Sequence, residues 1–208
     1  MEITTELLRR RLAGTELNQD PTEVMMPVGS ERWPRELREA LLKTLTPAGV
    51  LIPLIERSDG PAVLLTQRSA ALTHHAGQIS FPGGRMEESD ADIKATALRE
   101  THEEVGIEPQ HVSVFGCLDA MPTITGYAVT AVVGAVSAQA ELRIDRSEVE
   151  AVFEVPLEFL VDKRNAKAGE REYMGRLLPV VEFHYAGHRI WGATAHIILQ
   201  LRNIILKE

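Results

Sequence analysis

The chain has 208 residues, of which 44% are apolar and 25% are charged, and its formal net charge is −8. These values favour a soluble globular protein, with either one domain and an extension or two small domains. They disfavour a nucleic-acid-binding protein, which usually carries a basic patch. The negative charge would also repel a phosphate-bearing substrate, so local arginines or bound cations would have to attract one.

Two short helices are predicted near the N-terminus, the first over residues 5–12 and the second after a proline that suits a first helical turn. In the second, Leu37, Leu41 and Leu45 recur at helical spacing before a Thr-Pro pair closes the helix. We therefore predict an N-terminal helical extension over residues 1–46. It either packs on the rest of the chain or contributes to substrate binding or dimerisation.

Apolar runs separated by turn signals begin after this extension. The runs "AGVLIPLI" and "AVLLTQ" flank Asp59-Gly60 and predict a hairpin of buried strands. "QISFPGG" predicts a strand that enters a glycine turn, and residues 92–105 are the best helix candidate, with Gly106 as its C-terminal stop. "VSVFGCLD" and "YAVTAVVGAV" predict two further strands.

The C-terminal part continues this alternation. "VFEVPLEFLVD" predicts a strand and a short helix, "VVEFHYAGHRIW" predicts a hairpin turning at Ala186-Gly187, and "GATAHIILQLRNIIL" predicts a last helix. Strands interleaved with a few helices predict an α/β or α+β sheet domain over residues 47–208.

Three acids crowd the predicted helix at 92–105. Glu100, Glu103 and Glu104 stand at i, i+3 and i+4, so they project from one face, where like charges destabilise an isolated helix. No lysines relieve the repulsion. A solvated acidic face is the ordinary explanation, but a hard divalent cation, which prefers oxygen ligands, would turn the repulsion into coordination.

The segment "GGRMEESDADIKATALRETHEEVGI" resembles the Nudix box, which ends in Arg-Glu-x-x-Glu-Glu-x-Gly. It departs from that pattern in two ways, because Asp90 replaces a glutamate and the spacing from Asp90 to the Arg-Glu pair is one residue longer. The matching positions are Gly84, Arg99, Glu100, Glu103, Glu104 and Gly106.

The segment "LLTQRSAALTHHAGQISFPGG" resembles a second signature, that of the coenzyme A pyrophosphatase branch of Nudix hydrolases. Thr73 stands where that signature usually has arginine, so one phosphate-binding charge is absent. The resemblance implies a Nudix α/β/α sandwich with a mixed β-sheet. It also implies metal-dependent hydrolysis of coenzyme A or an acyl derivative to adenosine 3′,5′-bisphosphate and 4′-phosphopantetheine or its acylated form.

This resemblance gives the acids and the glycine turn specific roles. Glu100 and Glu104 would ligate Mg²⁺, or Mn²⁺, which shares its oxygen ligands, and the carbonyl of Gly84 would add a ligand. Glu103 would be either a third ligand or the general base, and the sequence does not separate these roles. Arg99 would orient Glu103 or a neighbouring carboxylate.

Three other residues have both an ordinary and a functional interpretation. Arg68 is either paired with an acid or binds substrate phosphate, which its guanidinium fork suits. His75 is either a plain loop histidine or a substrate contact. Glu148 is either an ordinary loop acid or an additional ligand or base. Asp90 is expected to cap or begin the helix.

Three other functions stay open. One is a Nudix diphosphatase acting on ADP-ribose or another nucleoside diphosphate derivative, because the box does not select the leaving group. Another is a non-catalytic Nudix-like ligand-binding module, although the retained acids disfavour it. The last is an acidic interaction protein without a metal.

The expected partner is a small-molecule substrate, with no nucleic acid and no membrane. Cys117 is the single cysteine, the N-terminal residues lack a secretory apolar region, and the apolar runs are shorter than the roughly 20 residues that span a bilayer. We therefore expect a cytoplasmic protein. The amphipathic N-terminal arm is a candidate homodimer contact.

Overall fold

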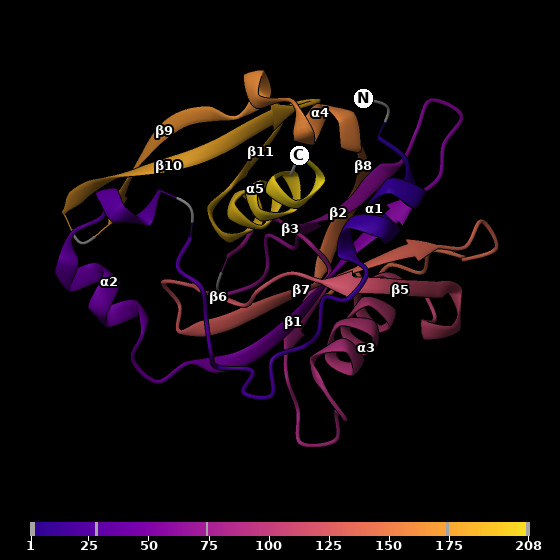
Figure 1. Ribbon diagram of the computed structural model, residues 1–208, viewed down its shortest axis with the longest axis horizontal. Helices are drawn as coiled ribbons and strands as arrows, with labels where there is room; N and C mark the ends of the chain where they lie inside the picture. The colour runs from indigo at the N-terminus through magenta and orange to yellow at the C-terminus, as the bar shows by residue number, and fades with distance from the viewer. Residues whose placement is uncertain (1–2, 28, 74, 174, 207–208) are drawn as a thin grey trace.

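A mixed β-sheet forms the centre of the protein (Figure 1). The computed structural model describes residues 3–27, 29–73, 75–173 and 175–206. The strands of this sheet are β1 (Thr46–Ile55), β2 (Ala62–Arg68), β3 (Ile79–Ser80), β4 (Gly83–Arg85), β5 (Val112–Cys117), β6 (Met121–Pro122), β7 (Tyr127–Val136) and β8 (Val149–Pro156).

Strand β1 organises the sheet. It runs parallel to β7 along its whole length, from Thr46 opposite Tyr127 to Ile55 opposite Val136. It pairs antiparallel with β2 on the side away from β7, and with β4 beside its first half. Strands β3 and β8 extend the sheet beyond β2, and β5 and β6 pair with β7. One long parallel pair among antiparallel pairs makes the sheet mixed, as predicted.

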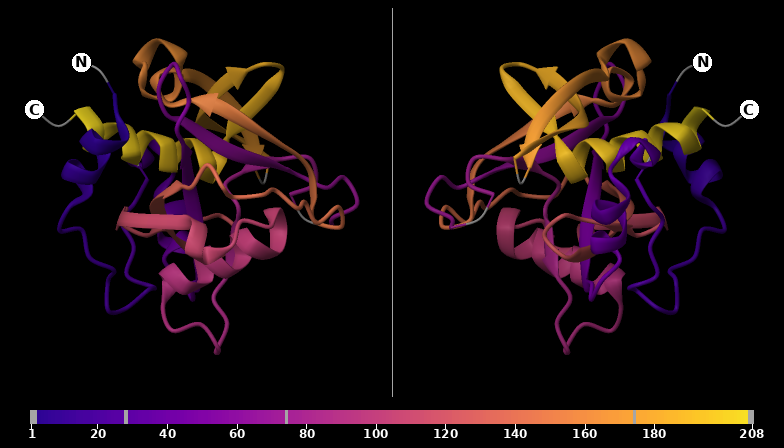
Figure 2. Two further views of the ribbon diagram at one scale, coloured as in Figure 1. Left: turned by 90° about the vertical axis from the view of Figure 1, so that its right-hand side faces the viewer. Right: turned by 90° about the vertical axis from the view of Figure 1, so that its left-hand side faces the viewer.

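Helices cover both faces of this sheet, as the side views show (Figure 2). Helix α3 (Ile93–Val105) lies on one face, and α1 (Thr5–Leu12) and α5 (Gly192–Leu206) lie on the other. Side chains alternate along β1 accordingly: Leu51 packs with Ala97 of α3, whereas Ile52 belongs to the main core with α5. The α/β/α sandwich is therefore confirmed.

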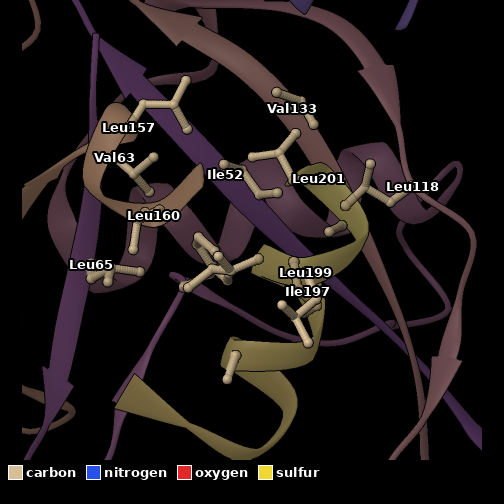
Figure 3. Packing of buried hydrophobic residues seen from close by; sticks show 14 of the residues in the cluster. Ile52, Val63, Leu65, Leu118, Val133, Leu157, Leu160, Ile197, Leu199 and Leu201 are labelled. Carbon is tan, nitrogen blue, oxygen red and sulfur yellow. The ribbon is translucent and has the colours of Figure 1, made fainter. Parts of the chain in front are cut away.

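The main core lies between the sheet and α5. Figure 3 shows side chains of α5 among those of β1, β2, β7 and the short helix α4 (Leu157–Val161). The residues labelled in Figure 3 are all almost fully buried: Ile52, Val63, Leu65, Leu118, Val133, Leu157, Leu160, Ile197, Leu199 and Leu201.

A second, three-stranded antiparallel sheet packs on the other side of α5 (Figure 1). It consists of β9 (Lys167–Tyr173), β10 (Arg176–Tyr185) and β11 (His188–Trp191), with the hairpin turning at Ala186 and Gly187 as predicted. Strand β9 is not predicted from the sequence, because its charged residues give no apolar pattern. Three 3₁₀ turns complete the described chain: Ser30–Arg32, Pro109–His111 and Lys163–Asn165.

The N-terminal segment is integrated into the domain. Leu8 and Leu12 of α1 are fully buried in the main core. Helix α2 (Arg35–Leu41) ends one turn earlier than predicted. The backbone N–H of Thr46 donates to Gly126 O at 2.9 Å, so pairing of β1 with β7 takes over from the helical pattern. The boundary at residue 46 stays a prediction.

Among the described residues, none of the helices has both the length and the apolar character needed to cross a bilayer.

Candidate active site

Helix α3 carries the acid cluster and is fixed at both ends. The carboxylate of Asp92 accepts the N–H of Ala95 at 2.8 Å, which caps the N-terminus, and Gly106 ends the helix at φ 78°. Asp90 was expected to cap this helix, and that expectation is wrong, because Asp92 does so. The first turn contains no acidic residue.

The three glutamates meet very different environments along this helix. The side chain of Glu104 is 3% exposed, that of Glu100 is 17% exposed, and that of Glu103 is 55% exposed. Around the helix, the acidic face therefore runs from Glu103 at the solvent side, through Glu100, to Glu104 at the buried side. Only Glu103 has the surroundings of an ordinary surface acid.

Arg99 binds two of these glutamates and is itself held by Asp90. Its Nη1 donates to Glu100 Oε1 at 3.0 Å and to Glu103 Oε2 at 2.9 Å. Its Nε and Nη2 donate to the two oxygens of Asp90 at 2.9 and 3.0 Å. The guanidinium holds the pKa of the Asp90 carboxyl far below its usual value, mainly through these hydrogen bonds. Arg99 thus connects Glu100, Glu103 and Asp90 through hydrogen bonds, and its role in orienting the glutamates stays a prediction.

Glu104 lies between α3, β2 and the glycine turn at β4. Its Oε1 is 3.7 Å from Nη1 of Arg68, and its Oε2 accepts a long hydrogen bond of 3.4 Å from Gly83 N. Burial raises the pKa of Glu104 to about 8, although the charge of Arg68 opposes this shift. These contacts do not fully compensate the buried carboxylate.

The backbone of Gly84 abuts the Glu100 carboxylate. A Cβ added at Gly84 would lie 2.5 Å from the carboxyl carbon of Glu100, so only glycine leaves room for that side chain. Burial raises the pKa of Glu100, and the negative charges of Glu103 and Glu148 add to the rise. The glycine turn and the acidic helix face are therefore in direct contact.

Glu148 and His75 lie on the loops that flank Arg68. Ser69 N donates to Glu148 O at 2.8 Å, and the charge of Glu148 contributes to the raised pKa values of Glu100 and Glu104. His75 is exposed, and its Nδ1 lies 3.0 Å from Gln78 Oε1. The structure thus associates Glu148 electrostatically with the acids, whereas His75 has no described contact with them.

Comparison with known proteins agrees with this geometry. The family model described as "NUDIX domain" matches residues 45–177. The chain belongs to the Nudix family. It is 40% identical over 165 residues to "Uncharacterized Nudix hydrolase NudL" from Escherichia coli O1:K1 / APEC, and equally to the protein of that name from Shigella boydii serotype 18. Each match covers 74% of this chain and 80% of the relative.

Among solved structures, a Caenorhabditis elegans Ap4A hydrolase complex matches with a TM-score of 0.47 and 19% identity, covering 53% of this chain and 80% of that one. The family assignment itself makes the chain a Nudix pyrophosphohydrolase, an enzyme that acts on phosphoanhydride bonds. Nudix hydrolases generally use divalent metal ions and act on small molecules.

The acids of the Nudix helix fit such an ion. Every side-chain donor offered by Glu100, Glu103 and Glu104 is an oxygen, which is what hard divalent cations prefer. Glu104 is a nearly buried carboxylate with only one distant cationic partner, and a metal ion would balance its charge. In the part of the chain that the structure describes, arginines bind these acids, and no three His, Cys, Asp or Glu side chains converge as a preformed metal cluster.

The Nudix segment also contains two features that the sequence did not reveal. One is the role of Asp90 as the anchor of Arg99, nine residues away and just outside the helix. The other is the burial of Glu104, which an isolated helical wheel places beside Glu103 and Glu100 on one acidic ridge. The long spacing between Asp90 and Arg99 hides the first feature, and packing against the sheet decides the second.

Proposed function

We propose that this Nudix hydrolase cleaves the pyrophosphate bond of coenzyme A or an acyl derivative. The products would be adenosine 3′,5′-bisphosphate and 4′-phosphopantetheine or its acylated form. One observation carries the proposal: Arg68, from the segment that resembles the coenzyme A pyrophosphatase branch, lies 3.7 Å from Glu104 of the Nudix box. The two signatures therefore contribute to one site.

The glutamates of α3 have different proposed roles in binding a metal ion. Glu100 and Glu104 are the proposed ligands of Mg²⁺ or Mn²⁺, and Glu103 and the Gly84 carbonyl are further candidates. The bound ion would neutralise phosphoryl oxygens and lower the pKa of bound water. Arg99 orients Glu100 and Glu103 through its hydrogen bonds, and Asp90 holds Arg99 in place.

Arg68 is the proposed phosphate ligand. Its side chain is 25% exposed, so a substrate can reach it, while its Nη1 faces the acids. A guanidinium offers several N–H donors to the oxygens of one phosphoryl group. Arg68 would hold the pyrophosphate beside the acids. His75, on the loop that follows Arg68, is a second proposed substrate contact.

The general base is either Glu103 or Glu148. Both carboxylates are accessible to water, and both raise the pKa of Glu100 through their negative charge. Glu103 is the more strongly oriented, because Arg99 binds it at 2.9 Å. Comparing the pH–rate profiles of Glu103→Gln and Glu148→Gln separates them, because only loss of the base removes the acidic limb of the profile.

Product identification by mass spectrometry tests the proposed reaction. Purified protein, incubated with coenzyme A and Mg²⁺ or Mn²⁺, should release adenosine 3′,5′-bisphosphate. ADP-ribose and a nucleotide sugar belong in the same panel, because the Nudix box alone does not select the leaving group. If ADP-ribose or the nucleotide sugar is hydrolysed faster than coenzyme A, that compound replaces coenzyme A as the proposed substrate. A folded protein that hydrolyses none of the three compounds would refute the proposal.

Glu104→Gln tests the metal assignment. We expect kcat to fall by more than about a hundredfold, because even outer partners of a metal site are worth roughly 10–100-fold. Glu88→Gln makes the same charge change at an exposed position of the same segment and should leave kcat unchanged. Circular dichroism would verify that both variants fold. Wild-type turnover in Glu104→Gln would show that the ligand assignment is wrong.

A further inference from the structure

The loop of residues 137–148, between β7 and β8, is bonded to the end of α3. Arg143 N donates to Val105 O at 2.8 Å, and Asp145 N donates to Glu104 O at 3.0 Å. Both acceptors are carbonyls of the last turn of α3, where a helix has no internal partners for them. The loop is therefore attached to α3 at the residue whose side chain lies 3.7 Å from Arg68.

The other end of the 137–148 loop is bonded to β2. Ser69 N donates to Glu148 O at 2.8 Å. Val149 then pairs with Arg68 where β8 begins. The loop therefore connects α3 with the end of β2. These are the two elements that bring Glu104 and Arg68 together in the proposed active site.

Asp145 organises the turn between these two attachments. Its Oδ1 accepts the Ser147 hydroxyl at 2.7 Å and Ser147 N at 2.8 Å, which is the pattern of an Asx turn. Its carbonyl accepts Val149 N at 2.9 Å and Glu148 N at 3.2 Å. The hydrogen bonds from Ser147, that of the hydroxyl first, lower the pKa of the Asp145 carboxyl. The charged carboxylate is therefore engaged within the loop.

Glu148 is the acid that this turn carries. Its N–H donates to Asp145 and its carbonyl accepts from Ser69, so its main chain is held on both sides. The residue is exposed, so water can reach its carboxylate. Its negative charge contributes to the raised pKa values of Glu100 and Glu104. The place of this carboxylate relative to the acids of α3 therefore depends on the backbone conformation of the turn.

We propose that Asp145 is a positioning residue that holds Glu148 beside the acids of α3 for the hydrolytic reaction. This inference rests on the proposed function, in which Glu148 is a candidate general base. Asp145 acts through the backbone, because its own carboxylate is engaged by Ser147. A catalytic group must be held within about 0.5 Å of its productive place, and a misplacement of about 1 Å can cost on the order of a hundredfold in rate.

Steady-state kinetics of two substitutions at this position test the role. Asp145→Ala removes the acceptor of both hydrogen bonds from Ser147, so we expect kcat for coenzyme A to fall at least about tenfold. KM should change less than about twofold, because the phosphate-binding Arg68 lies outside the turn. Asp145→Asn keeps an oxygen that accepts both hydrogen bonds, so it should retain at least about half of the wild-type kcat.

A double-mutant cycle tests whether Asp145 acts through Glu148. In the Glu148→Gln background, adding Asp145→Ala should lower kcat by less than about a further twofold, because the group that Asp145 positions is already lost. A merely structural contribution of Asp145 would lower kcat by the same factor in both backgrounds.

A matched control and a readout without turnover complete the experiment. Asp20 forms the same kind of turn elsewhere, with its Oδ1 accepting Thr22 N at 2.8 Å and the Thr22 hydroxyl at 2.6 Å. Asp20→Ala should therefore leave kcat and KM unchanged. Amide hydrogen exchange followed by NMR reports the bond from Ser69 N to Glu148 O, and the Ser69 amide should exchange faster in Asp145→Ala than in wild type or Asp20→Ala.

The outcomes separate this inference from the proposed function. If coenzyme A is hydrolysed and both substitutions of Asp145 lose kcat equally, or the loss in Asp145→Ala persists in full without Glu148, the positioning role is refuted while the reaction stands. If only ADP-ribose or the nucleotide sugar is hydrolysed, the same cycle with that compound decides the positioning role, and only the proposed substrate fails. Unchanged exchange at Ser69 in Asp145→Ala would refute the role whichever compound is hydrolysed.

Discussion

Glu104 shows how one residue can be costly for the fold and useful for the reaction. Its carboxylate is almost fully buried, yet its nearest cationic partner is 3.7 Å away. A buried charge with so little compensation destabilises a folded protein. Such a carboxylate suits the binding of a divalent cation, because the ion supplies the positive charge that the neighbouring side chains do not provide.

The pH dependence of stability should reveal this cost when divalent ions are removed. The pKa of Glu104 is raised from 4.5 to about 8, so the folded protein holds this proton more tightly than the unfolded chain does. Its contribution to the free energy of unfolding is therefore full below pH 4.5 and is lost as pH rises to about 8. Glu104→Gln should avoid this loss, which is on the order of a few kcal/mol.

Urea unfolding in EDTA at pH 5 and pH 9 measures this effect. The stability advantage of Glu104→Gln over wild type should be small at pH 5 and largest at pH 9. Glu88→Gln provides the control for the general loss of one negative charge. An advantage of the same size at both pH values would contradict the buried, protonated carboxyl group.

At the scale of elements, the junction of β4 and α3 builds the site. The cap at Asp92 and the left-handed Gly106 fix the ends of α3, and the pairing of Gly84 with Gly49 fixes β4 against β1. The backbone of β4 lies so close to the Glu100 side chain of α3 that no side chain fits at Gly84. The position of Glu100 therefore depends on a residue that contributes no side chain.

Gly84→Ala should displace Glu100 from its place beside β4. The added methyl would lie 2.5 Å from the Glu100 carboxyl carbon, so we expect kcat/KM to fall by at least about tenfold and stability by about 1–3 kcal/mol. Gly126→Ala provides a comparison, because its Cβ would meet no atom within 4 Å and only its φ of 84° opposes the change. Wild-type kinetics in Gly84→Ala would contradict the close packing.

At the scale of the whole molecule, the N-terminal segment completes the core. Leu8 and Leu12 of α1 are fully buried against the face of the sheet that α5 also covers. Arg9 adds a contact from outside, with its guanidinium 4.8 Å from the Phe115 ring centroid. The segment that the sequence treats as an extension is thus part of the packing of the domain.

Leu12→Ala should destabilise the protein by about 2–5 kcal/mol, as is usual for a fully buried leucine. Leu42→Ala, at a side chain that is 54% exposed, should change stability by less than about 0.5 kcal/mol. Chemical denaturation measures both free energies of unfolding. Equal effects of the two substitutions would show that α1 is only a surface arm.

The sequence by itself determined the elements and the chemistry that local patterns encode. The strands β1 and β2, the helix α3 with its glycine stop and the hairpin at Ala186-Gly187 follow from apolar periodicity and turn residues. The oxygen-rich character of the site follows from three glutamates on one helix face.

The tertiary structure decided what depends on contacts between distant segments. It ended α2 early because β1 pairs with β7, and it formed β9 from residues without an apolar pattern. It also buried Glu104, paired Asp90 with Arg99 and placed the Arg171 guanidinium over the Trp191 ring. The physical reason is that burial and pairing depend on which surfaces meet, and a one-dimensional pattern contains no information about residues many positions away.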